Sequence, residues 1–505
     1  MNTMYSSCPP SPHVETIDEA RENINHLWRM LHAAVNLIQA NGVMLQSQAQ
    51  RIIDLEERLG LNSSNSSKPP STDNPAQTTA KTKKKPTRRK RAKRGAQPGH
   101  KGTARELVPI DQVNHIVTCT PYSDCFCGGH VMLDRDQPER KQVFELPRIP
   151  ADVTEYQIFS GICDKCGKRH AGVLPIGVPS GILGPCATAK IAIMTGEYRL
   201  SKRLVVRMMD DFHGLKICIG TVSNAEKKVS DVLAIPVKEA VSYVQELTNE
   251  AVNGDETGHK QAGVKMNLWV ASALLVTVFM IRVTRSTKEA VDLLGIGFLG
   301  ILISDRWGAY NWVDVTRRQL CWAHLIRDFV RIAIRGGRQG RIGLKILAYS
   351  RRMFKLWYGV RNKTLSRSDF QQGMVSIRAK IEALLEQGAQ LTGDGESKTA
   401  GTCKKILKFR VALWTFVDHE GVEPTNNQAE RMLRHYVLWR KSSFGTQSDR
   451  GNRFVERILT VVSTCHQQKR SVLGYVTDAV KANLGGRPVP SLLPQKKTEH
   501  ANLAA

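Results

Sequence analysis

The strongest apolar pattern in the chain is a seven-residue repeat near the N-terminus. One seam position is isoleucine or leucine throughout, at Ile24, Leu31, Ile38, Leu45, Ile52 and Leu59. This spacing is typical of a coiled coil. The second seam position holds Leu27, Ala34, Asn41, Gln48 and Leu55, and its two polar residues would fix register at a cost in stability. We expect a helix over residues 17–60 that self-associates; the alternative is an amphipathic helix docked on its own protein.

Residues 61–104 interrupt the apolar periodicity. They begin with the polar hinge LNSSNSSKPPSTD and continue into ten lysines and arginines between Lys81 and Arg94. This charge density cannot fold on itself and extends by self-repulsion. We expect a disordered arm that binds DNA phosphates without selecting sequence; a solvated linker is the alternative. The predicted phosphate-binding residues are Lys83, Lys84, Lys85, Arg88, Arg89, Lys90, Arg91 and Arg94.

Two cysteine-bearing turns, CTPYSDCFCGG and CDKCGKRH, lie within residues 105–175, with the strand-like segments KQVFELP and VTEYQIF between them. Four thiolates suit a structural Zn²⁺ ion with tetrahedral coordination. We predict a zinc-ribbon-like domain whose ligands are Cys125, Cys127, Cys163 and Cys166. The first turn is irregular, so Asp124, Cys119 or His130 are alternative ligands. Four free or buried thiols are the alternative to a zinc site.

Helical periodicity follows over residues 180–240. The pattern predicts a helix from about Lys202 to Phe212, a turn at His213 and Gly214, and a second helix that opens near Thr221. This region is helix-turn-helix-like, an arrangement that can place its second helix in the major groove of DNA. The same pattern is also common where two helices only pack together.

Short apolar runs replace the helical period over residues 248–335. They predict the order strand, strand, strand, helix, strand, helix, strand, which is that of a ribonuclease-H-like core with a mixed sheet flanked by helices. Asp255 and Asp305 stand at the ends of two predicted strands. The strand before Asp255 is weak, because Asn253 and Gly254 occupy positions where β-formers are expected.

A third acidic residue, Glu430, lies in the first turns of a predicted helix capped by Thr425 or Asn426. The gap between Asp305 and Glu430 is too long for a simple loop, and its contents have a helical period. We therefore expect an all-α insertion over residues 336–420, followed by the rest of the core over 421–484. The tail, residues 485–505, is expected to be disordered.

Composition adds a second line of evidence. The chain has 505 residues, and 73 Lys and Arg against 46 Asp and Glu give a net charge of +27. Such a charge favours a polyanionic partner, either nucleic acid or an anionic membrane surface. The longest apolar run, at residues 268–281, is shorter than the roughly 20 residues that span a bilayer, and the N-terminus is not a signal peptide. Eleven cysteines are too few for a disulfide scaffold. We expect a soluble cytoplasmic protein.

Convergent carboxylates suit phosphoryl transfer assisted by two divalent cations. Their hard oxygen ligands favour Mg²⁺ or Mn²⁺. Asp255, Asp305 and Glu430 are the candidates, but Glu430 is also placed to pair with Arg434 on the helix surface. Rival acids are Glu256, Asp328, Asp418 and Glu423.

Several motifs follow one another in a characteristic order: LGLNSSNSSKPPS, RGAQPGHKG, the cysteine turns, DETG, SDRWGAY, CWAHLIRDF, NNQAERMLR and RKSSFGTQSDRG. In this order and over nearly the whole chain, the sequence resembles transposases of the insertion sequence 66 family. The resemblance implies a DDE-type DNA transposase, α/β and multidomain, whose catalytic triad is Asp255, Asp305 and Glu430. Cys321 and His324 match the CxxH element of the family and are expected to support the core, as is Arg431.

The implied activity is Mg²⁺-dependent cleavage at the ends of an insertion sequence and strand transfer into target DNA. The implied partners are the terminal repeats, target DNA, a second copy of the chain and accessory proteins of the same element. The protein would be nucleoid-associated in a bacterial cytoplasm when bound to DNA. A non-catalytic DNA-binding regulator, a decayed transposase that still binds ends, and a hydrolytic nuclease are the alternatives.

Overall fold

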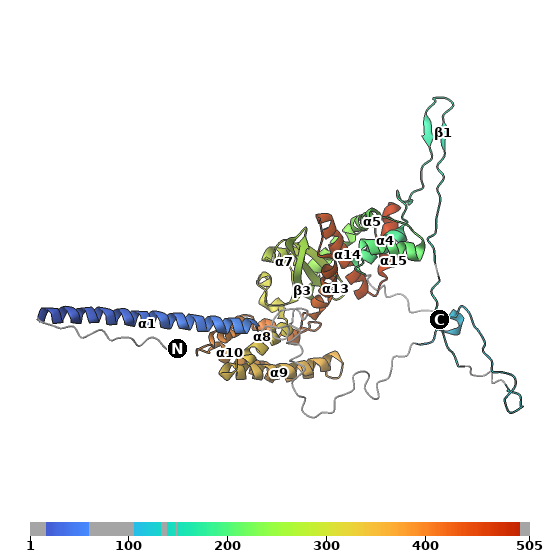
Figure 1. The fold of residues 1–505 in the computed structure, drawn as a ribbon. Coiled ribbons are helices and arrows are strands. Elements are labelled where there is room, and N and C mark those ends of the chain that lie inside the picture. The colour runs from blue at the N-terminus through green and yellow to red at the C-terminus, as the bar shows by residue number, and fades with distance from the viewer. Residues whose placement is uncertain (1–16, 60–105, 133–138, 148, 495–505) are drawn as a thin grey trace. The chain divides into compact units, whose positions relative to one another are not determined.

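The structure is a computed structural model that describes residues 17–59, 106–132, 139–147 and 149–494 (Figure 1). The chain divides into two units, one of Met1–Lys83 with Ala323–Lys408 and the other of Lys84–Trp322 with Phe409–Ala505. The predicted hinge and basic arm lie outside the described residues, and so do all eight predicted phosphate-binding side chains. Among the described helices, none is both long and apolar enough to cross a membrane.

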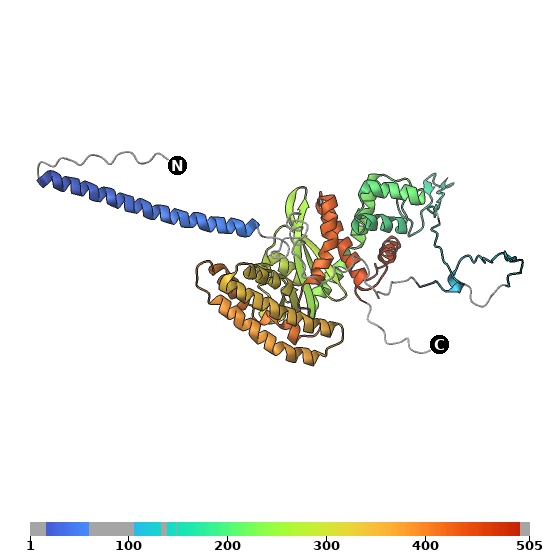
Figure 2. The ribbon, with the colours of Figure 1, turned by 60° about the horizontal axis from the view of Figure 1, so that its bottom comes forward.

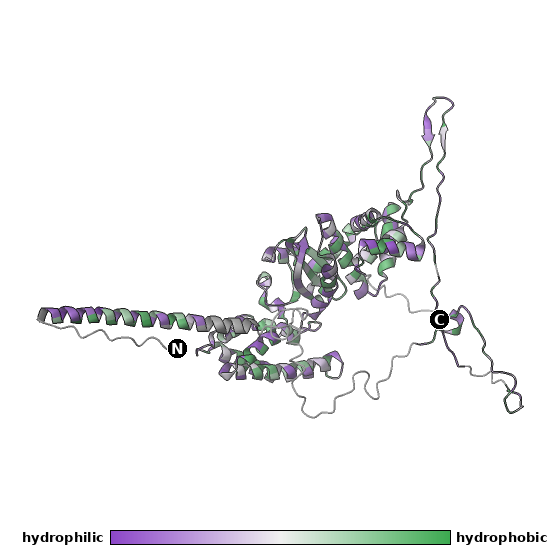
Figure 3. Cartoon of the chain, in the orientation of Figure 1, coloured by the Kyte–Doolittle hydropathy of each residue, from purple (hydrophilic) through white to green (hydrophobic). Residues whose placement is uncertain are grey.

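The first unit begins with one long helix, α1, over Ile17–Leu59. The helix follows from its continuous heptad pattern and matches the prediction. Apolar positions lie among polar ones along its length (Figure 3). The seam residues Ile24, Leu31, Ile38 and Leu45 are each more than half exposed. Self-association through this seam stays a prediction.

The other described part of the first unit is helical. Helix α8 (Trp322–Ile334) starts one residue before the unit and continues into it, and α9 (Gly337–Arg361), α10 (Arg367–Ala389) and α11 (Ser397–Leu407) follow. Phe370, Met374 and Ile377 recur at helical spacing on α10 and are buried. Residues 336–407 therefore contain helices alone, as their period predicts. The remainder up to residue 420 forms η5 (Val411–Leu413) and α12 (Thr415–Asp418) in the second unit.

Residues 106–175 of the second unit contain little regular structure. They form the short turn η2 (Ile110–Gln112) and a hairpin of β1 (Ser160–Ile162) and β2 (Arg169–Ala171) around the second cysteine turn. The expected strands KQVFELP and VTEYQIF do not form. No described strand pairs with them, and Val143, Leu146 and Val153 are at least 83% exposed. Strands need cross-strand partners and a covered face, which this segment lacks here.

Four helices come next: α3 (Pro185–Gly196), α4 (Lys202–His213), α5 (Ile219–Val232) and α6 (Ala234–Glu246). The side chain of Ser201 caps α4 by accepting a hydrogen bond from the backbone N–H of Leu204, 3.3 Å away. Gly214 ends α4 in the left-handed region with φ +62°. Val205 and Met209 of α4 and residues of α5 belong to one buried apolar cluster. The predicted helix pair is therefore present.

A five-stranded mixed sheet forms the centre of the second unit (Figure 2). Its strands are β3 (Thr248–Gln261), β4 (Val264–Ser272), β5 (Thr277–Arg282), β6 (Leu299–Ser304) and β7 (Arg318–Leu320), in the order β5-β4-β3-β6-β7. The first three strands are antiparallel, whereas β6 is parallel to β3 and β7 is parallel to β6. Helix α7 (Thr287–Leu294) connects β5 to β6. The mixed sheet matches the predicted fold class.

Two details of the sheet differ from the prediction. Strand β3 does not end at Asp255 but continues to Gln261, because β4 pairs with it from Asn253 to Gln261. In place of the α-helix expected between β6 and β7, the chain forms two single-turn 3₁₀ helices, η3 (Gly308–Tyr310) and η4 (Val315–Arg317). Asp314 starts the second of these turns, since its side chain accepts hydrogen bonds from the N–H and the hydroxyl of Thr316.

Helices α13 (Asn427–Ser443), α14 (Asp449–Gln467) and α15 (Val472–Leu484) complete the second unit. Helix α14 covers the edge strand β5 through three side chains spaced four residues apart. The hydroxyls of Thr464 and Thr460 and the carboxylate of Glu456 accept hydrogen bonds from backbone N–H groups of β5. The outer edge of the sheet is thus closed to pairing with other strands.

Residues 485–494 pack against the core and do not form the disordered segment that their composition predicts. Leu492 is fully buried. The side chain of Gln468 donates a hydrogen bond to its carbonyl, and Tyr475 donates one to the carbonyl of Pro490, 2.8 Å away. Specific long-range contacts therefore override the local Pro and Gly content. Residues 495–505 lie outside the described residues.

Candidate active site

The register of the sheet places two aspartates at the same level. Asn253 of β3 is paired with Ile303 of the parallel strand β6. Asp255 and Asp305 each follow two residues later, where β6 ends and β3 continues. The backbone N–H of Trp307 binds Asp305 Oδ1 at 2.8 Å, and the N–H of Glu256 binds Asp255 Oδ1 at 2.8 Å. Both carboxylates are therefore oriented by the main chain.

Glu430 is positioned by the N-terminus of α13, which is attached to β3. The side chain of Asn426 donates a hydrogen bond to the carbonyl of Gly254 at 2.8 Å, one residue before Asp255. Gln428 bonds the β4–β5 turn through the carbonyl of Ala273, also at 2.8 Å. Glu430 lies in the first turn of the same helix. A helix N-terminus also carries a partial positive charge, which favours a carboxylate there.

The three acids share one electrostatic environment. Burial raises the pKa of Asp255 well above its usual value, and the charges of Glu256, Asp305 and Glu430 raise it further. Repulsion among carboxylates of this kind is relieved by divalent cations with oxygen preference. Carboxylate oxygens suit Mg²⁺ or Mn²⁺, and Asp255, Asp305 and Glu430 are the residues that would hold such ions. Their ligand atoms do not all lie within 4.8 Å of one another in this structure.

Glu256 lies in this environment but has its own structural partners. Its side chain is almost fully buried, accepts a hydrogen bond from the hydroxyl of Tyr310 at 2.7 Å and forms an ion pair with Arg285. The guanidinium of Arg285 stacks over Trp307, 4.6 Å from the ring centroid. Trp307 follows Asp305 by two residues. Glu256 thus braces the segment that carries Asp305, and its existing partners make it a weaker candidate ligand.

A buried cation, Arg318, lies beneath Asp305. Its guanidinium donates to the backbone carbonyl of Asp305 at 3.3 Å and to Asn311 Oδ1 at 3.1 Å. The side chain is fully buried, and burial lowers its pKa to about 10, although the charge of Asp305 acts in the opposite direction. The positive charge of Arg318 therefore offsets part of the negative charge of the site.

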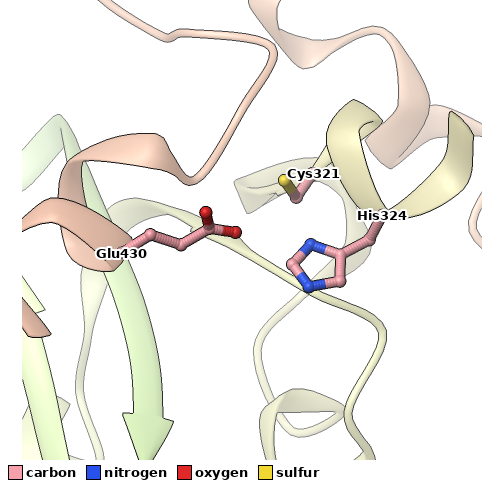
Figure 4. A group of neighbouring side chains, drawn as sticks. All are labelled: Cys321, His324 and Glu430. Carbon is pink, nitrogen blue, oxygen red and sulfur yellow. The ribbon is translucent and has the colours of Figure 1, made fainter. Parts of the chain in front are cut away.

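The side chains of Cys321 and His324 face the carboxylate of Glu430 (Figure 4). One ligand atom of each of these three residues lies within 4.8 Å of the others, and this is the one group of three or more potential metal ligands found among the described residues. The Sγ of Cys321 accepts a hydrogen bond from the backbone N–H of Asn426 at 3.2 Å. Cys321 therefore contacts the start of α13; the supporting role expected of Cys321 and His324 stays a prediction. Arg431, in contrast, is exposed on α13.

The four predicted zinc ligands form two separate pairs. Backbone N–H groups and the partner thiol lower the pKa of Cys127 in the first turn and of Cys163 in the second. Asp124 and His130, two of the alternative ligands, bond each other at 3.1 Å. Each turn therefore favours thiolates, but the described residues do not gather the two turns into one four-ligand group.

Several residues around the acids carry no signal in the sequence that predicts their place. Tyr310 and Asn426 become part of the site through contacts between residues far apart in the chain. Arg318 becomes part of it through burial and a bond to Asn311, seven residues away. Asn426 was expected only as a helix cap. Glu256, which adjoins Asp255 in DETG, was a rival candidate in the sequence, but its partners Tyr310 and Arg285 were not predicted.

Comparison with known families gives a match over the region that contains the sheet. The family profile described as "Transposase IS66 family" matches residues 180–453, more than half of the chain. The chain belongs to this family. A second profile, a family of unknown function, matches residues 9–106. The IS66 match spans the sheet, the helical insertion and all three candidate acids.

A curated relative of this IS66 family member is "Uncharacterized protein y4qI" of Sinorhizobium fredii. The two are 29% identical over 214 residues, which make up 39% of each chain. The matched part thus spans well under half of the relative's length.

Asp255→Asn is expected to stabilise this IS66 family protein in magnesium-free buffer at pH 7, by about 0.5–2 kcal/mol. Because the folded-state pKa of Asp255 is raised, the wild type loses stability as the pH rises from the unfolded pKa through the folded one. The gain should vanish below about pH 4, where Asp255 is protonated in both states. Urea unfolding at the two pH values measures it.

Added Mg²⁺ should then stabilise the wild type more than the Asp255→Asn protein, because a ligand that binds the folded state alone raises its stability. A variant that is less stable than the wild type at pH 7 without magnesium would show that Asp255 is not repelled by its neighbours.

Proposed function

We propose that this protein is a DDE-type transposase that cleaves DNA at the ends of its own element and joins them to target DNA. The observation that supports the proposal is the electrostatic coupling of Asp255 with Asp305 and Glu430, all three of which lie inside the region matched by the transposase family. In this proposal the mixed sheet is a ribonuclease-H-like core, and the three acids are its catalytic triad.

The mechanism assigns one task to each part of the site. Two Mg²⁺ or Mn²⁺ ions held by Asp255, Asp305 and Glu430 would supply activation of the attacking oxygen and stabilisation of the leaving oxygen. The two aspartates present carboxylates from adjacent strands, and Asn426 fixes the helix that presents Glu430. Arg318 and the Glu256–Arg285 pair hold the segment around Asp305 in place.

The proposal includes several binding partners of the protein. The basic arm would bind DNA phosphates, and the heptad seam of α1 would pair two copies so that both element ends are handled together. Accessory proteins of the same element are a further expected partner. A structural Zn²⁺ ion at Cys125, Cys127, Cys163 and Cys166 stays a prediction, supported by the two thiol pairs.

The test is a product analysis with the purified full-length protein. The substrate is labelled DNA that carries the native sequence flanking the gene, with a supercoiled plasmid as target and Mg²⁺ as the metal. A transposase yields labelled ends joined to the plasmid. Cut ends without joined products would identify a nuclease, and binding without cleavage would identify a regulator or a decayed enzyme.

A further inference from the structure

Phe444 is an exposed aromatic residue in a strained backbone position. It directly follows α13 and has φ +60°, the left-handed region that glycine usually occupies at this position of a helix end. Its side chain is 80% exposed. A bulky residue in this backbone conformation lowers the stability of the folded protein. The ring is exposed, so its burial does not offset this loss. The position therefore points to a use for the exposed ring outside the fold.

The backbone beside Phe444 is held against the end of β3. Thr446 donates its N–H to the carbonyl of Lys260 at 2.9 Å, and Ala262 donates its N–H to the carbonyl of Thr446 at 2.8 Å. Gly445, which lies between Phe444 and Thr446 in the chain, has φ +112°. A Cβ atom at this position would lie 2.1 Å from the carbonyl oxygen of Lys260. The backbone at Gly445 therefore packs directly against the backbone of Lys260, with no room for a side chain between them. This contact fixes the backbone position of the neighbouring Phe444.

A buried histidine strengthens this attachment. His259 of β3 is 2% exposed, its Nε2 donates to Asn452 Oδ1 at 2.9 Å, and its Nδ1 accepts from the hydroxyl of Tyr436. Nε2 also lies 3.1 Å from the hydroxyl of Thr446. One side chain therefore links β3 to α13, to α14 and to the loop beside Phe444.

A cavity of about 520 Å³ opens beside the ring. It is lined by Gly258, His259, Lys260, Lys265, Met266, Asn267, Arg440 and Phe444. Three of these residues are cationic, and none is acidic. Lys260 and Lys265 are paired directly across β3 and β4, and both are exposed. Two ammonium groups on directly paired strand residues repel each other, so binding of an anion between Lys260 and Lys265 would be favourable.

We propose that this cavity, which we call the Phe444 groove, binds an unpaired nucleotide of the DNA on which the protein acts. The base stacks on Phe444, and the flanking phosphates contact Lys260 and Lys265. Stacking on an aromatic ring beside a basic track is the general mode by which proteins hold single-stranded DNA. The inference rests on the proposed function, since it assigns a segment of the same DNA to a second site.

The groove is separate from the three acids. Lys260 follows Asp255 by five residues in β3, which correspond to about 17 Å of antiparallel strand. Because successive side chains of a strand alternate between its two faces, Lys260 and Asp255 lie on opposite faces. In this proposal the groove therefore holds a segment of the DNA other than the cleaved position.

The test measures the affinity of the full-length protein for a labelled 30-nucleotide single strand and for the blunt duplex of the same sequence. Phe444→Leu keeps an apolar side chain but removes the ring, whereas Phe444→Trp keeps a ring. We expect Phe444→Leu to weaken single-strand binding about tenfold and to leave duplex binding within about twofold. Phe444→Trp should match the wild type with both probes.

Two further variants serve as controls. Leu274→Ala removes a side chain of similar exposure, 78%, from the β4–β5 turn and should change neither affinity. Lys265→Gln should weaken the salt dependence of single-strand binding. The negative slope of log affinity against log salt should become shallower by about 0.7, the value of one lost phosphate contact. Equal melting temperatures of all variants exclude unfolding as the cause.

The outcomes separate this inference from the proposed function. If the wild type binds both probes and Phe444→Leu binds the single strand equally well, the groove is not a nucleotide site and the proposed function stands. If polyglutamate displaces the single strand as effectively as unlabelled DNA of equal charge, and Phe444→Leu weakens both equally, the groove binds an acidic peptide. If the wild type binds neither probe, both proposals are wrong.

Discussion

Glu430→Gln is expected to reduce cleavage of element-end DNA at least about 1000-fold, because it removes one of three charged ligands from the reacting centre. The amide has nearly the same shape and can still accept hydrogen bonds, so α13 should remain attached to β3 through Asn426. DNA affinity should stay within about twofold of the wild type. Gel analysis of labelled ends measures cleavage, and a binding titration measures affinity.

Glu423→Gln is the matched control for this variant. Glu423 is an exposed carboxylate seven residues before Glu430 and was a rival candidate in the sequence. Its replacement should leave cleavage within about twofold of the wild type. Equal losses in the two variants, or full activity of Glu430→Gln, would remove Glu430 from the triad.

Gly445→Ala is expected to lower the free energy of unfolding of the second unit by roughly 2–4 kcal/mol. The added methyl would lie 2.1 Å from the carbonyl oxygen of Lys260, and φ +112° is unfavourable for alanine. To relieve the contact, the loop must leave β3 and break the two backbone hydrogen bonds of Thr446. Urea unfolding followed by tryptophan fluorescence measures the loss.

Gly220→Ala provides the comparison within the same unit. Gly220 is the second residue of α5, and the nearest side-chain atom, Cys218 Sγ, would lie at an ordinary 3.5 Å from the new methyl group. This variant should be as stable as the wild type within about 0.5 kcal/mol, or slightly more stable. If both variants unfold at the same urea concentration, the loop beside Phe444 is not held in the way described.

Sequence periodicity predicts the elements whose pattern is local. Helix α1, helix α4 with its end at Gly214, and the helices of the insertion all appear where expected. The segments KQVFELP and VTEYQIF show the limit of this reasoning. Their alternation is strand-like, but a strand also requires a partner, and no described strand pairs with them.

The opposite failure occurs at β3. Asn253 and Gly254 have low strand propensity, yet they lie in the longest strand of the sheet. Pairing with β4 and β6 on both sides decides the conformation. Gly254 also has a positive reason to be glycine, because a Cβ there would lie 3.0 Å from Leu302 Cδ1. Tertiary contact thus overrides local propensity where the candidate site is built.

The candidate acids were predictable from the sequence, but their surroundings were not. Asp255, Asp305 and Glu430 were chosen from predicted strand ends, a helix start and the family resemblance, although β3 continues past Asp255 to Gln261. The Asn426 bond to Gly254 joins residues 172 positions apart, and the His259 bond to Asn452 joins residues 193 positions apart. The place of Arg318 depends on its burial. No local pattern encodes these features. Phe444 was visible only as part of RKSSFGTQSDRG, and its exposure and backbone strain needed the fold.

The central claim, that Asp255, Asp305 and Glu430 drive DNA transposition, is tested most directly by movement of the element in cells. A resistance marker is placed between the native flanking sequences, and the protein is supplied as the wild type or as Asp305→Ala at equal expression. The account predicts marker movement with the wild type and at least about a 1000-fold lower frequency with the variant. Equal movement with both proteins would contradict the assigned triad.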